Sequence, residues 1–285
     1  MNSRLIPAAA AMVSVYDRGF AYGDSLIETL KILRGQPVFL HEHFQRLRRA
    51  MGQAGFETML DSDGLRNQAI SLAAANEVRE GRLRIQLSRG VPPGTAAGVD
   101  PGSDLTPTLL LTAEPSTGYQ DELYREGVFC ETVAANRGRY AGVKSGSLMN
   151  TLIARREAIA AGAWEAIFTS GHGRLLEGSF TNIFFLCGER LLTAGEDRPI
   201  LPGVAREKVI GIAGEMGVEV RFEAPKITEL RSGEDSALLT SSLLGVCPIR
   251  EIDGLKLRMG RELCAQIAER LRELELADIE KNALD

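Results

Sequence analysis

The sequence is poor in the residues that most often bind metals or form disulfides. It contains four cysteines and three histidines in 285 residues. The cysteines are widely spaced and include no C-x-x-C pair, which argues against a zinc site and against a disulfide framework. His41 and His43 lie two residues apart, a spacing that does not place them on one face of a helix. We therefore expect no metal site and predict that the cysteines are buried free thiols.

Long apolar runs and an excess of basic residues are also missing. No segment approaches the length that crosses a bilayer, and the first residues show no apolar region followed by a cleavage pattern. We therefore expect a cytoplasmic protein with no membrane partner. The formal net charge of -5 argues against nucleic acid as the main partner, because binding phosphate backbones requires a basic face. A local basic pocket for one small anion is compatible with this charge.

The chain is longer than one minimal domain, so we predict two lobes. The run PSTG, which begins at Pro115, has the composition of a linker. We place an N-terminal lobe at residues 1–115, an interdomain linker at 116–124 and a C-terminal lobe at 125–285. The predicted strands and helices are mixed without strict strand–helix–strand alternation, which favours an α+β fold over a doubly wound sheet.

Hydrophobic periodicity and turn residues predict the order of the elements. In the N-terminal lobe they predict a hairpin with its turn at 34–36, helices over 41–55 and 61–77, and strands over 82–90 and 106–115. In the C-terminal lobe they predict strands over 127–133, 164–170 and 181–187, a helix over 201–217, a strand–turn–strand unit over 237–254 and a closing helix over 261–274. They also predict a helix over 147–162, with Leu148, Leu152 and Ile159 on one side.

The stretch RYAGVKSGSLMN places a single lysine, Lys144, among small residues. A lysine that acts as a nucleophile must lose its proton near neutral pH, and small neighbours let a flat ligand approach the backbone. The alternative is an exposed loop lysine, which composition alone favours because most lysines are solvated.

The stretch LLEGSFTN places Glu177 between two leucines and small residues, ahead of an apolar strand. A half-buried carboxylate needs a partner, and a protonated ring nitrogen would be one. The alternative is a surface glutamate in a turn, which is the better explanation of this segment by itself.

Three separate segments offer contacts for a phosphate. Arg46 lies on the predicted helix over 41–55. Val204 and Ala205 lie at a predicted helix start, where backbone N–H groups favour an anion. Thr240 and Ser241 lie in a turn whose hydroxyls and amides suit phosphate oxygens. Each is also explained by an exposed arginine, a proline-started helix or a hydroxyl-rich turn, so only the combination is informative.

Taken in order, the segments of this chain resemble the fold-type IV family of pyridoxal phosphate enzymes, the class-IV aminotransferase group. This group includes branched-chain and D-amino-acid aminotransferases and 4-amino-4-deoxychorismate lyase. The resemblance covers nearly the whole chain and is carried by DRGFAYGDSLIETL, EHFQRL, RLRIQLSRG, GVKSGSLMNTLIARREA, LLEGSFTNIFF, ILPGVAREKVI and LLTSSLLGVCPIREIDG. It implies a small N-terminal α/β lobe, a larger C-terminal α+β lobe with pyridoxal 5'-phosphate between them, and a homodimer.

The resemblance also implies roles for the matching positions. Lys144 would bind the cofactor as a Schiff base and move protons at Cα and C4′. Glu177 would keep the ring nitrogen protonated, so that the ring remains an electron sink. Leu201 would pack on the ring face opposite the substrate. Tyr22 and Arg84 would lie near the substrate and the phosphate.

The same resemblance assigns the phosphate to Arg46, Val204, Ala205, Thr240 and Ser241. Ala205 stands where relatives commonly have threonine, so one hydroxyl contact is lost and only the amide is left.

The segment TSSLLGVCP distinguishes between the activities of the group. Branched-chain enzymes have G-T-A-A-E-[VI]-T-P there, whereas this chain resembles the lyase pattern N-S-L-M-G-x-x-P-[VI], with Ser241 in place of the asparagine. The loop RGVPPGTAAGVDP also lacks the R-x-H with which D-amino-acid enzymes hold the substrate carboxylate.

We therefore expect 4-amino-4-deoxychorismate lyase activity, which releases pyruvate and leaves p-aminobenzoate for folate synthesis. The alternatives are an aminotransferase acting on D- or branched-chain amino acids, with an (R)-amine transaminase as a variant, and a scaffold that binds a small ligand without catalysis. Ser147, which replaces an asparagine common after the lysine, is a further departure that bears on the substrate.

Overall fold

The computed structural model describes residues 1–93, 105–134 and 138–282 and divides the chain into two compact units. The first unit comprises Met1–Thr117, Val143–Leu148 and Asp278–Asp285. The second unit comprises Gly118–Gly142 and Met149–Ala277. The first unit thus contains six residues around Lys144 and the end of the chain, in addition to the segment that the sequence predicts for the N-terminal lobe.

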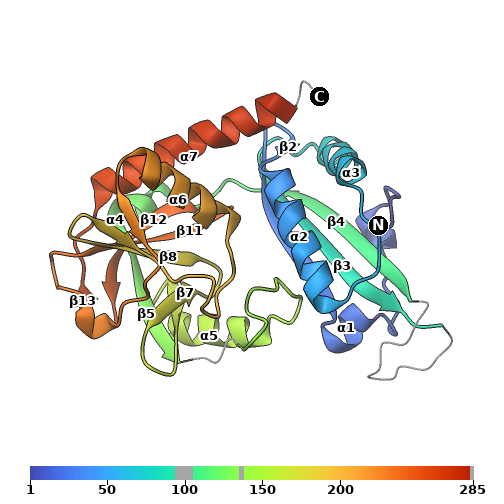
Figure 1. Cartoon of the computed structure of the whole chain (residues 1–285). Helices are drawn as coiled ribbons and strands as arrows, with labels where there is room; N and C mark the ends of the chain where they lie inside the picture. The colour runs from blue at the N-terminus through green and yellow to red at the C-terminus, as the bar shows by residue number, and fades with distance from the viewer. Residues whose placement is uncertain (94–104, 135–137, 283–285) are drawn as a thin grey trace. The chain divides into compact units, whose positions relative to one another are not determined.

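The first unit is built on an antiparallel sheet with the strand order β2-β1-β3-β4. Its strands are β1 (Ser25–Leu33), β2 (Gln36–Pro37), β3 (Gly81–Val91) and β4 (Thr106–Pro115). Its helices are α1 (Arg18–Tyr22), α2 (Leu40–Ala54) and α3 (Ser62–Ala75), with a 3-10 turn, η1, at Ala8–Ala10. Figure 1 shows α2 running across this sheet. Apolar residues of α2 and α3 and alternate residues of β1 and β3 form one core.

The predicted hairpin and its following helix are confirmed. Arg34 and Gly35 have φ angles of 52° and 79°, the left-handed conformations that a two-residue hairpin turn requires. The second strand contains only Gln36–Pro37, because α2 begins soon after it at Leu40. The helix ends as predicted at Gly55, whose φ is 66°.

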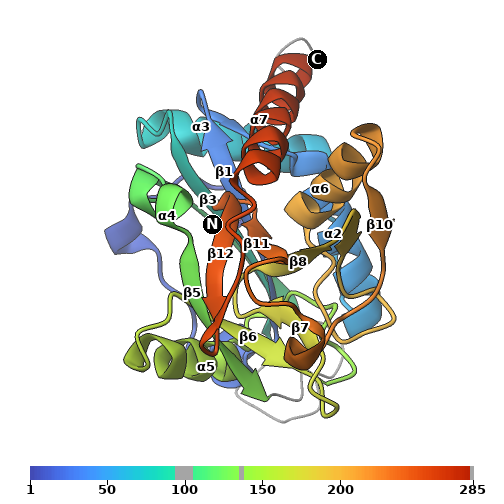
Figure 2. The ribbon, with the colours of Figure 1, turned by 90° about the vertical axis from the view of Figure 1, so that its left-hand side faces the viewer.

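The second unit is built on a mixed sheet with the order β10-β9-β8-β11-β12-β5-β6-β7, in which β7 also pairs with β8 and β13 pairs with β12. Figure 2 shows β11, β12 and β5 near the middle of this sheet. Its strands are β5 (Val128–Ala134), β6 (Glu165–Thr169), β7 (Leu175–Gly178), β8 (Asn182–Cys187), β9 (Arg190–Leu192), β10 (Glu219–Arg221), β11 (Ser236–Ser241), β12 (Gly245–Ile252) and β13 (Leu255–Lys256). Its helical segments are α4 (Asp121–Glu126), α5 (Met149–Ala160), α6 (Val204–Glu215), η2 (Ile227–Glu229) and α7 (Arg261–Asn282), the last of which belongs to this unit up to Ala277.

The mixture of helices and strands confirms the α+β fold class. Two details differ from the sequence-based expectation. The segment over 171–179, which separates two predicted strands and for which no strand is predicted, contains β7, which pairs with β6 and β8. The closing helix continues eight residues past 274, because Leu271, Glu275 and Ile279 stay buried at a spacing of four residues.

The expected apolar side of α5 is wrong as a packing face. Leu152 and Ile159 are 51% and 56% exposed. The buried side chains of this helix are short ones: Thr151, Ala154 and Ala158. Ala154 and Ala158 lie in one cluster with Phe168 of β6. Small side chains let the helix approach the sheet closely, so the larger residues lie on its outer side.

The cysteines are free thiols, as predicted, and three of them, Cys130, Cys247 and Cys264, are buried, whereas Cys187 is partly buried. Burial raises the pKa of Cys247 and of Cys264 to about 12, so both stay protonated at neutral pH.

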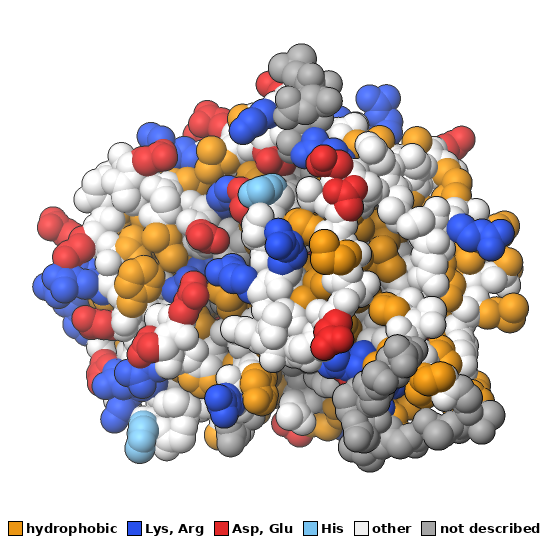
Figure 3. All heavy atoms as spheres, turned by 45° about the vertical axis from the view of Figure 1, so that its right-hand side comes forward, with side chains coloured by type: hydrophobic (Ala, Val, Ile, Leu, Met, Phe, Trp, Pro, Cys, Tyr) orange, Lys and Arg blue, Asp and Glu red, His pale blue; other side chains and the backbone are white. Residues whose placement is uncertain are grey.

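The surface carries charges of both signs. On the face drawn in Figure 3, basic and acidic side chains alternate without a large area of one sign. Within 1–93, 105–134 and 138–282, no helix is both long and apolar enough to cross a membrane. In the same ranges, no three histidine, cysteine, aspartate or glutamate side chains gather as metal ligands would.

The packing of α5 can be tested with a pair of substitutions on the same helix. Ala158→Leu inserts a large side chain against β6 and should lower the free energy of unfolding by about 1–3 kcal/mol. Leu152→Ala, on the outer side, should change it by less than about 0.5 kcal/mol. Urea unfolding followed by circular dichroism measures both, and a larger loss for Leu152→Ala would refute this orientation of the helix.

Candidate active site

The loop that contains Lys144 lies along the edge of β1 in the first unit. Ile27 N donates to Lys144 O over 2.9 Å, and Gly146 N donates to Ser25 O over 2.7 Å. A Cβ atom at residue 146 would overlap Ser25 Oγ, so any residue other than glycine would force a shift there. The lysine is therefore held by backbone hydrogen bonds to a regular strand and does not lie on a free loop.

Ser147 fixes the other end of this loop. Its Oγ donates to Gly23 O, in the turn before β1, over 3.1 Å. This hydrogen bond gives Ser147 a role in placing the loop, which the sequence alone did not suggest.

The turn before β1 is itself anchored by a buried aspartate. Asp17 is 1% exposed and accepts hydrogen bonds from Ser88 Oγ and Thr108 Oγ1, both over 2.7 Å, and from Gly19 N over 2.8 Å. Tyr22 lies at the end of α1 in this segment and is 45% exposed. Its position is therefore set by the segment that Asp17 anchors, and its role toward a substrate stays a prediction.

Arg46 is buried in a cluster of charges. It forms a two-pronged ion pair with Glu28, with Nε to Oε1 at 2.9 Å and a terminal nitrogen to Oε2 at 2.6 Å. His43 Nδ1 lies 2.7 Å from Glu28 Oε2. All three side chains are at most 5% exposed. The sequence indicated Arg46 but gave no reason to select Glu28 or His43.

The charges in this cluster determine its protonation. Burial by itself raises the pKa of Glu28, but the charge and hydrogen bonds of Arg46, with the hydrogen bond from His43, outweigh it and lower that pKa to about 2. Burial lowers the pKa of His43, and the charges of Arg46 and Lys144 lower it further against the opposing effect of Glu28. Glu28 is therefore ionised and His43 neutral at pH 7, and the Lys144 charge is near enough to affect His43.

Arg84 lies in the sheet of the first unit, on the face opposite Glu28. It is in β3 opposite Thr29, whereas Glu28 lies opposite Ile85. Successive residues of a strand point to opposite faces, so the structure does not bring Arg84 together with Arg46. Burial lowers the pKa of Arg84, and the charge of Arg82 adds to this effect.

Glu177 lies in the second unit, on β7, and is 2% exposed. Its Oε2 accepts hydrogen bonds from Leu201 N over 2.9 Å and from Asn182 Nδ2 over 3.3 Å. Asn182 Nδ2 also donates to Leu201 O over 2.9 Å. Asn182 thus joins Glu177 to the segment of Leu201. It ends the LLEGSFTN stretch, but nothing in the sequence pattern singled it out.

Strand register places Thr240 beside this group. Asn182 of β8 lies opposite Glu177 of β7 on one side and opposite Thr240 of β11 on the other. Thr240 is 1% exposed, and within the described part of the chain its Oγ1 has no hydrogen-bond partner. Ser241 Oγ accepts from Leu244 N over 3.2 Å and so closes the turn after β11.

The start of α6 is close to the same group. Gly203 precedes the helix and makes no side-chain cap, and a Cβ atom there would overlap Asn182 Oδ1. Val204 and Ala205 form the buried first turn. Arg206 follows them, is 3% exposed and donates to Ala194 O over 2.7 Å. Burial lowers the pKa of Arg206, against the charges of Glu196 and Glu177.

These features fit pyridoxal phosphate, the cofactor that the resemblance implies. The buried hydroxyl of Thr240 has no hydrogen-bond partner among the residues that the structure describes, so it is ready to donate to an anion. The N-terminus of the twelve-residue helix α6 has no side-chain cap and favours negative charge. Glu177 is a buried acceptor fixed by two N–H donors, which suits the nitrogen of a ring.

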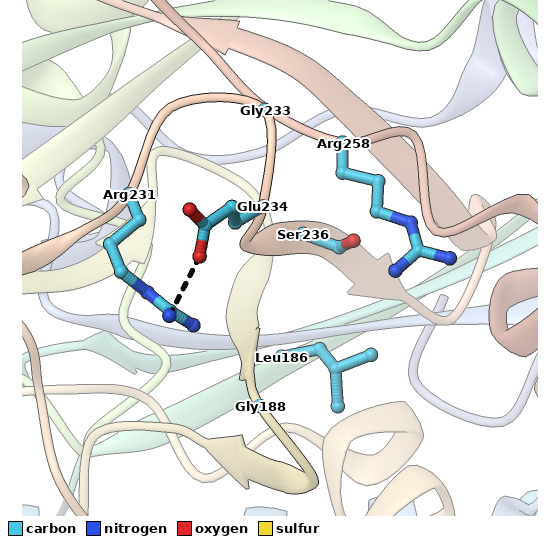
Figure 4. A pocket seen from close by; sticks show the side chains of 7 residues that line it. All are labelled: Leu186, Gly188, Arg231, Gly233, Glu234, Ser236 and Arg258. Carbon is cyan, nitrogen blue, oxygen red and sulfur yellow. Dashed lines mark ion pairs between the residues drawn. The ribbon is translucent and has the colours of Figure 1, made fainter.

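A separate pocket of about 510 Å³ lies in the second unit (Figure 4). It is lined by Leu186, Gly188, Arg231, Gly233, Glu234, Ser236 and Arg258. Arg231 is already paired with Glu234 at 2.7 Å and with Asp235 at 2.9 Å. The charges around it nearly cancel, and no residue proposed for the cofactor or substrate lines it.

The buried ion pair of the first unit predicts a pH-dependent loss of stability. Glu28→Gln leaves Arg46 buried without a carboxylate and should lower the free energy of unfolding by about 3–5 kcal/mol at pH 7. Because folding lowers the pKa of Glu28 from 4.5 to about 2, this contribution is present above pH 4.5 and is lost as the pH falls toward 2.

Urea unfolding at pH 7, 5 and 3.5 measures this difference. Glu114→Gln is the matched control, because Glu114 pairs with Arg82 at 2.7 Å on the surface of the same unit and is 55% exposed. A stability difference between the native chain and Glu28→Gln that does not narrow below pH 4.5 would contradict the assignment.

Comparison with known proteins identifies the family of this chain. The family model for amino-transferase class IV matches residues 25–252. The chain is 28% identical to D-alanine aminotransferase of Bacillus licheniformis, over 91% of this chain and 89% of that protein. It is 27% identical to aminodeoxychorismate lyase of Bacillus subtilis, over 89% of this chain and 86% of that protein.

Solved structures give the same result. A branched-chain aminotransferase from Thermoproteus uzoniensis, crystallised with norvaline, is 26% identical and has a TM-score of 0.86, over 98% of this chain and 94% of that one. The fold-type IV architecture is thereby confirmed. The chain belongs to the class IV aminotransferase family, whose enzymes depend on pyridoxal phosphate.

Proposed function

We propose that the chain is a 4-amino-4-deoxychorismate lyase that uses pyridoxal 5'-phosphate to form p-aminobenzoate and pyruvate. The observation that carries this proposal is the segment SSLLGVCP, residues 241–248, which runs from the last residue of β11 through the turn into β12. Ser241 closes its turn, and Leu244 is 3% exposed, with its carbonyl accepting from Tyr124 OH over 2.9 Å. Hydrogen bonds and burial therefore fix this segment in place. It lacks the glutamate and the paired alanines of the branched-chain pattern.

Bound pyridoxal phosphate supplies an electron sink for the charge that develops at the substrate Cα. Lys144 would hold the cofactor through its side-chain amine and, when that amine is unprotonated, would accept the proton from the substrate Cα. Its backbone hydrogen bond to β1 orients it for this task. Glu177, held by Leu201 N and Asn182 Nδ2, would keep a proton on the ring nitrogen.

The proposed phosphate contacts are charges, hydroxyls and backbone amides. Arg46 supplies the positive charge, and its pairing with Glu28 fixes the direction of the guanidinium. Thr240 and Ser241 supply hydroxyls, and the N–H groups of Val204 and Ala205 supply the helix start. Ala205 has no hydroxyl, so its contribution is the amide alone. Leu201 would pack on the ring, and Tyr22 would lie on the substrate side. The family resemblance assigns Arg84 to the substrate side as well, but Arg84 lies on the face of the β1–β3 sheet opposite Glu28.

The second candidate is an aminotransferase acting on D- or branched-chain amino acids. The names of the relatives support it, since D-alanine and branched-chain aminotransferases are both among them. The lack of an R-x-H after Arg89 weighs against a D-amino-acid substrate. Most of that loop, 94–104, lies outside the described residues.

The lyase proposal predicts product formation without an acceptor. Incubation with aminodeoxychorismate and added pyridoxal phosphate, but no 2-oxo acid, should release equal amounts of pyruvate and p-aminobenzoate. Chromatography measures the p-aminobenzoate, and a coupled assay measures the pyruvate. Lys144→Ala should lower the rate by roughly 10³-fold or more, because the covalent link and the proton acceptor are lost together. The exposed Lys256→Ala is the matched control.

Two other outcomes are informative. Formation of pyridoxamine phosphate with D-alanine or a branched-chain amino acid, and no product from aminodeoxychorismate, would favour the aminotransferase instead. Borohydride reduction followed by mass spectrometry should give a pyridoxyl adduct on Lys144, and an adduct without any turnover would favour a scaffold that binds the cofactor but does not catalyse.

We also propose that the protein is a homodimer, as the family resemblance implies and as is commonest among symmetric assemblies. Light scattering after size-exclusion chromatography should then give about twice the chain mass of 30.9 kDa. A mass of one chain at micromolar concentration would contradict it.

A further inference from the structure

The turn between β7 and β8 connects two of the groups to which the proposed function assigns a role. Glu177 precedes this turn and Asn182 follows it, and only the four residues 178–181 separate them. The two side chains hydrogen-bond to each other over 3.3 Å. The path of this short turn therefore sets the direction of both side chains.

A buried carboxylate from another strand holds this turn. Glu165 of β6 is 0% exposed. Its Oε1 accepts a short hydrogen bond from Ser179 Oγ and one from Ala166 N over 2.9 Å. Its Oε2 accepts from Phe180 N over 3.3 Å and from Thr181 Oγ1 over 3.1 Å. Three successive residues of the turn thus donate to one carboxylate.

Gly178, at the start of the turn, leaves room for this contact because it has no side chain. A Cβ atom at Gly178 would overlap Thr181 Oγ1 and would lie 3.0 Å from Glu165 Cγ. Gly178 N also donates to Thr181 O over 2.7 Å, and Ser179 N donates to Ala166 O over 2.8 Å. Close approach of Glu165 to the turn therefore depends on the glycine that directly follows Glu177.

A cation from α5 balances the buried charge. Arg155 lies 3.0 Å from Glu165 Oε1, and its side chain is 26% exposed. The same guanidinium lies over the rings of Trp164 and Phe180, at 5.2 and 5.6 Å. A buried carboxylate is stable only when it is paired and hydrogen-bonded, and Arg155 and the turn donors together meet both conditions for Glu165.

We propose that Glu165 is a positioning residue that fixes the turn and thereby aims Glu177 and Asn182, with Arg155 as its supporting cation. This inference rests on the proposed function, because the direction of the Glu177 side chain matters only if Glu177 contacts the nitrogen of the cofactor ring. Glu165 itself touches neither substrate nor cofactor in this account. Its effect passes through the turn, so it depends on Glu177 being present.

The chemistry of the carboxylate gives the substitution that tests this. An ionised carboxylate only accepts, and five donors converge on Glu165. Glu165→Gln keeps the shape but turns one acceptor oxygen into an NH2 group that faces donors. The turn should then loosen while the core around it keeps its volume.

The first measurement is a double-mutant cycle on cofactor binding. Glu165→Gln and Glu177→Gln should each weaken the binding of pyridoxal phosphate, by roughly tenfold, in a fluorescence titration. The double variant should bind about as weakly as Glu177→Gln alone, because the first substitution acts through the second residue. Losses that multiply would overturn the proposal.

The second measurement is amide hydrogen exchange of the chain without cofactor. Glu165→Gln should speed exchange in the peptide over 178–183. Asp235→Asn is the matched control, because Asp235 is a buried carboxylate of the same unit, 1% exposed, that accepts from Arg231 and not from this turn. Its exchange over 178–183 should equal that of the native chain, and unchanged exchange in Glu165→Gln would overturn the proposal.

The two measurements separate this inference from the proposed function. If Glu177→Gln binds the cofactor as tightly as the native chain, the role proposed for Glu177 is wrong, and the exchange measurement still decides whether Glu165 holds the turn. If Glu177→Gln weakens binding but Glu165→Gln does not, the function stands and the positioning role is overturned.

Discussion

The burial of carboxylates is the constraint on which this structure depends most. A carboxylate removed from water is stable only when fixed donors surround it, so each one defines the geometry of its neighbourhood. Glu28 does this for Arg46, Asp17 for the turn before β1, and Glu165 for the turn after Glu177. Glu177 is the fourth, and its donors come from the segment of Leu201 and from Asn182. Each of these acids is at most 2% exposed. In both units, the groups that the proposed chemistry needs are therefore held by buried acids that do not themselves react, apart from Glu177.

Strand register explains how groups from distant parts of the sequence form one arrangement within the second unit. Asn182 stands opposite Glu177 and opposite Thr240, so three adjacent strands bring an acid, an amide and a hydroxyl into one row. The amide also reaches Leu201 O, which ties the row to the segment before α6. A slip of one residue in either pairing would turn one of these side chains to the other face of the sheet. The row is thus as rigid as the sheet that carries it.

Much of the fold was predictable because its signals are local. The Arg34-Gly35 turn, the glycine stop of α2 and the alternation in β3 are each specified by a few neighbouring residues. The face of α5 was not predictable, because its small residues pack and its large ones do not, which a search for apolar stripes reverses. The site residues that the sequence missed share a different cause. Glu28, Asn182 and Glu165 are recognisable only by their partners, which lie on other strands or helices. The resemblance to a family identified Lys144 and Glu177 as site residues through the order of the segments. The local sequence around each residue favoured an exposed lysine and a surface glutamate instead.

The small residues around the functional groups acquire a more specific meaning from the structure. From the sequence, Gly146 beside Lys144 suggested clearance for a flat ligand. In the structure the space at Gly146 is filled by Ser25, that at Gly178 by Thr181 and that at Gly203 by Asn182. In each case a polar side chain of the protein lies where a Cβ atom would have been. The glycines therefore act first on the protein itself, by letting hydrogen-bonding side chains come close to the backbone beside a functional residue. A Cβ atom at any of these positions would therefore require a shift within the protein itself, whether or not a ligand is bound.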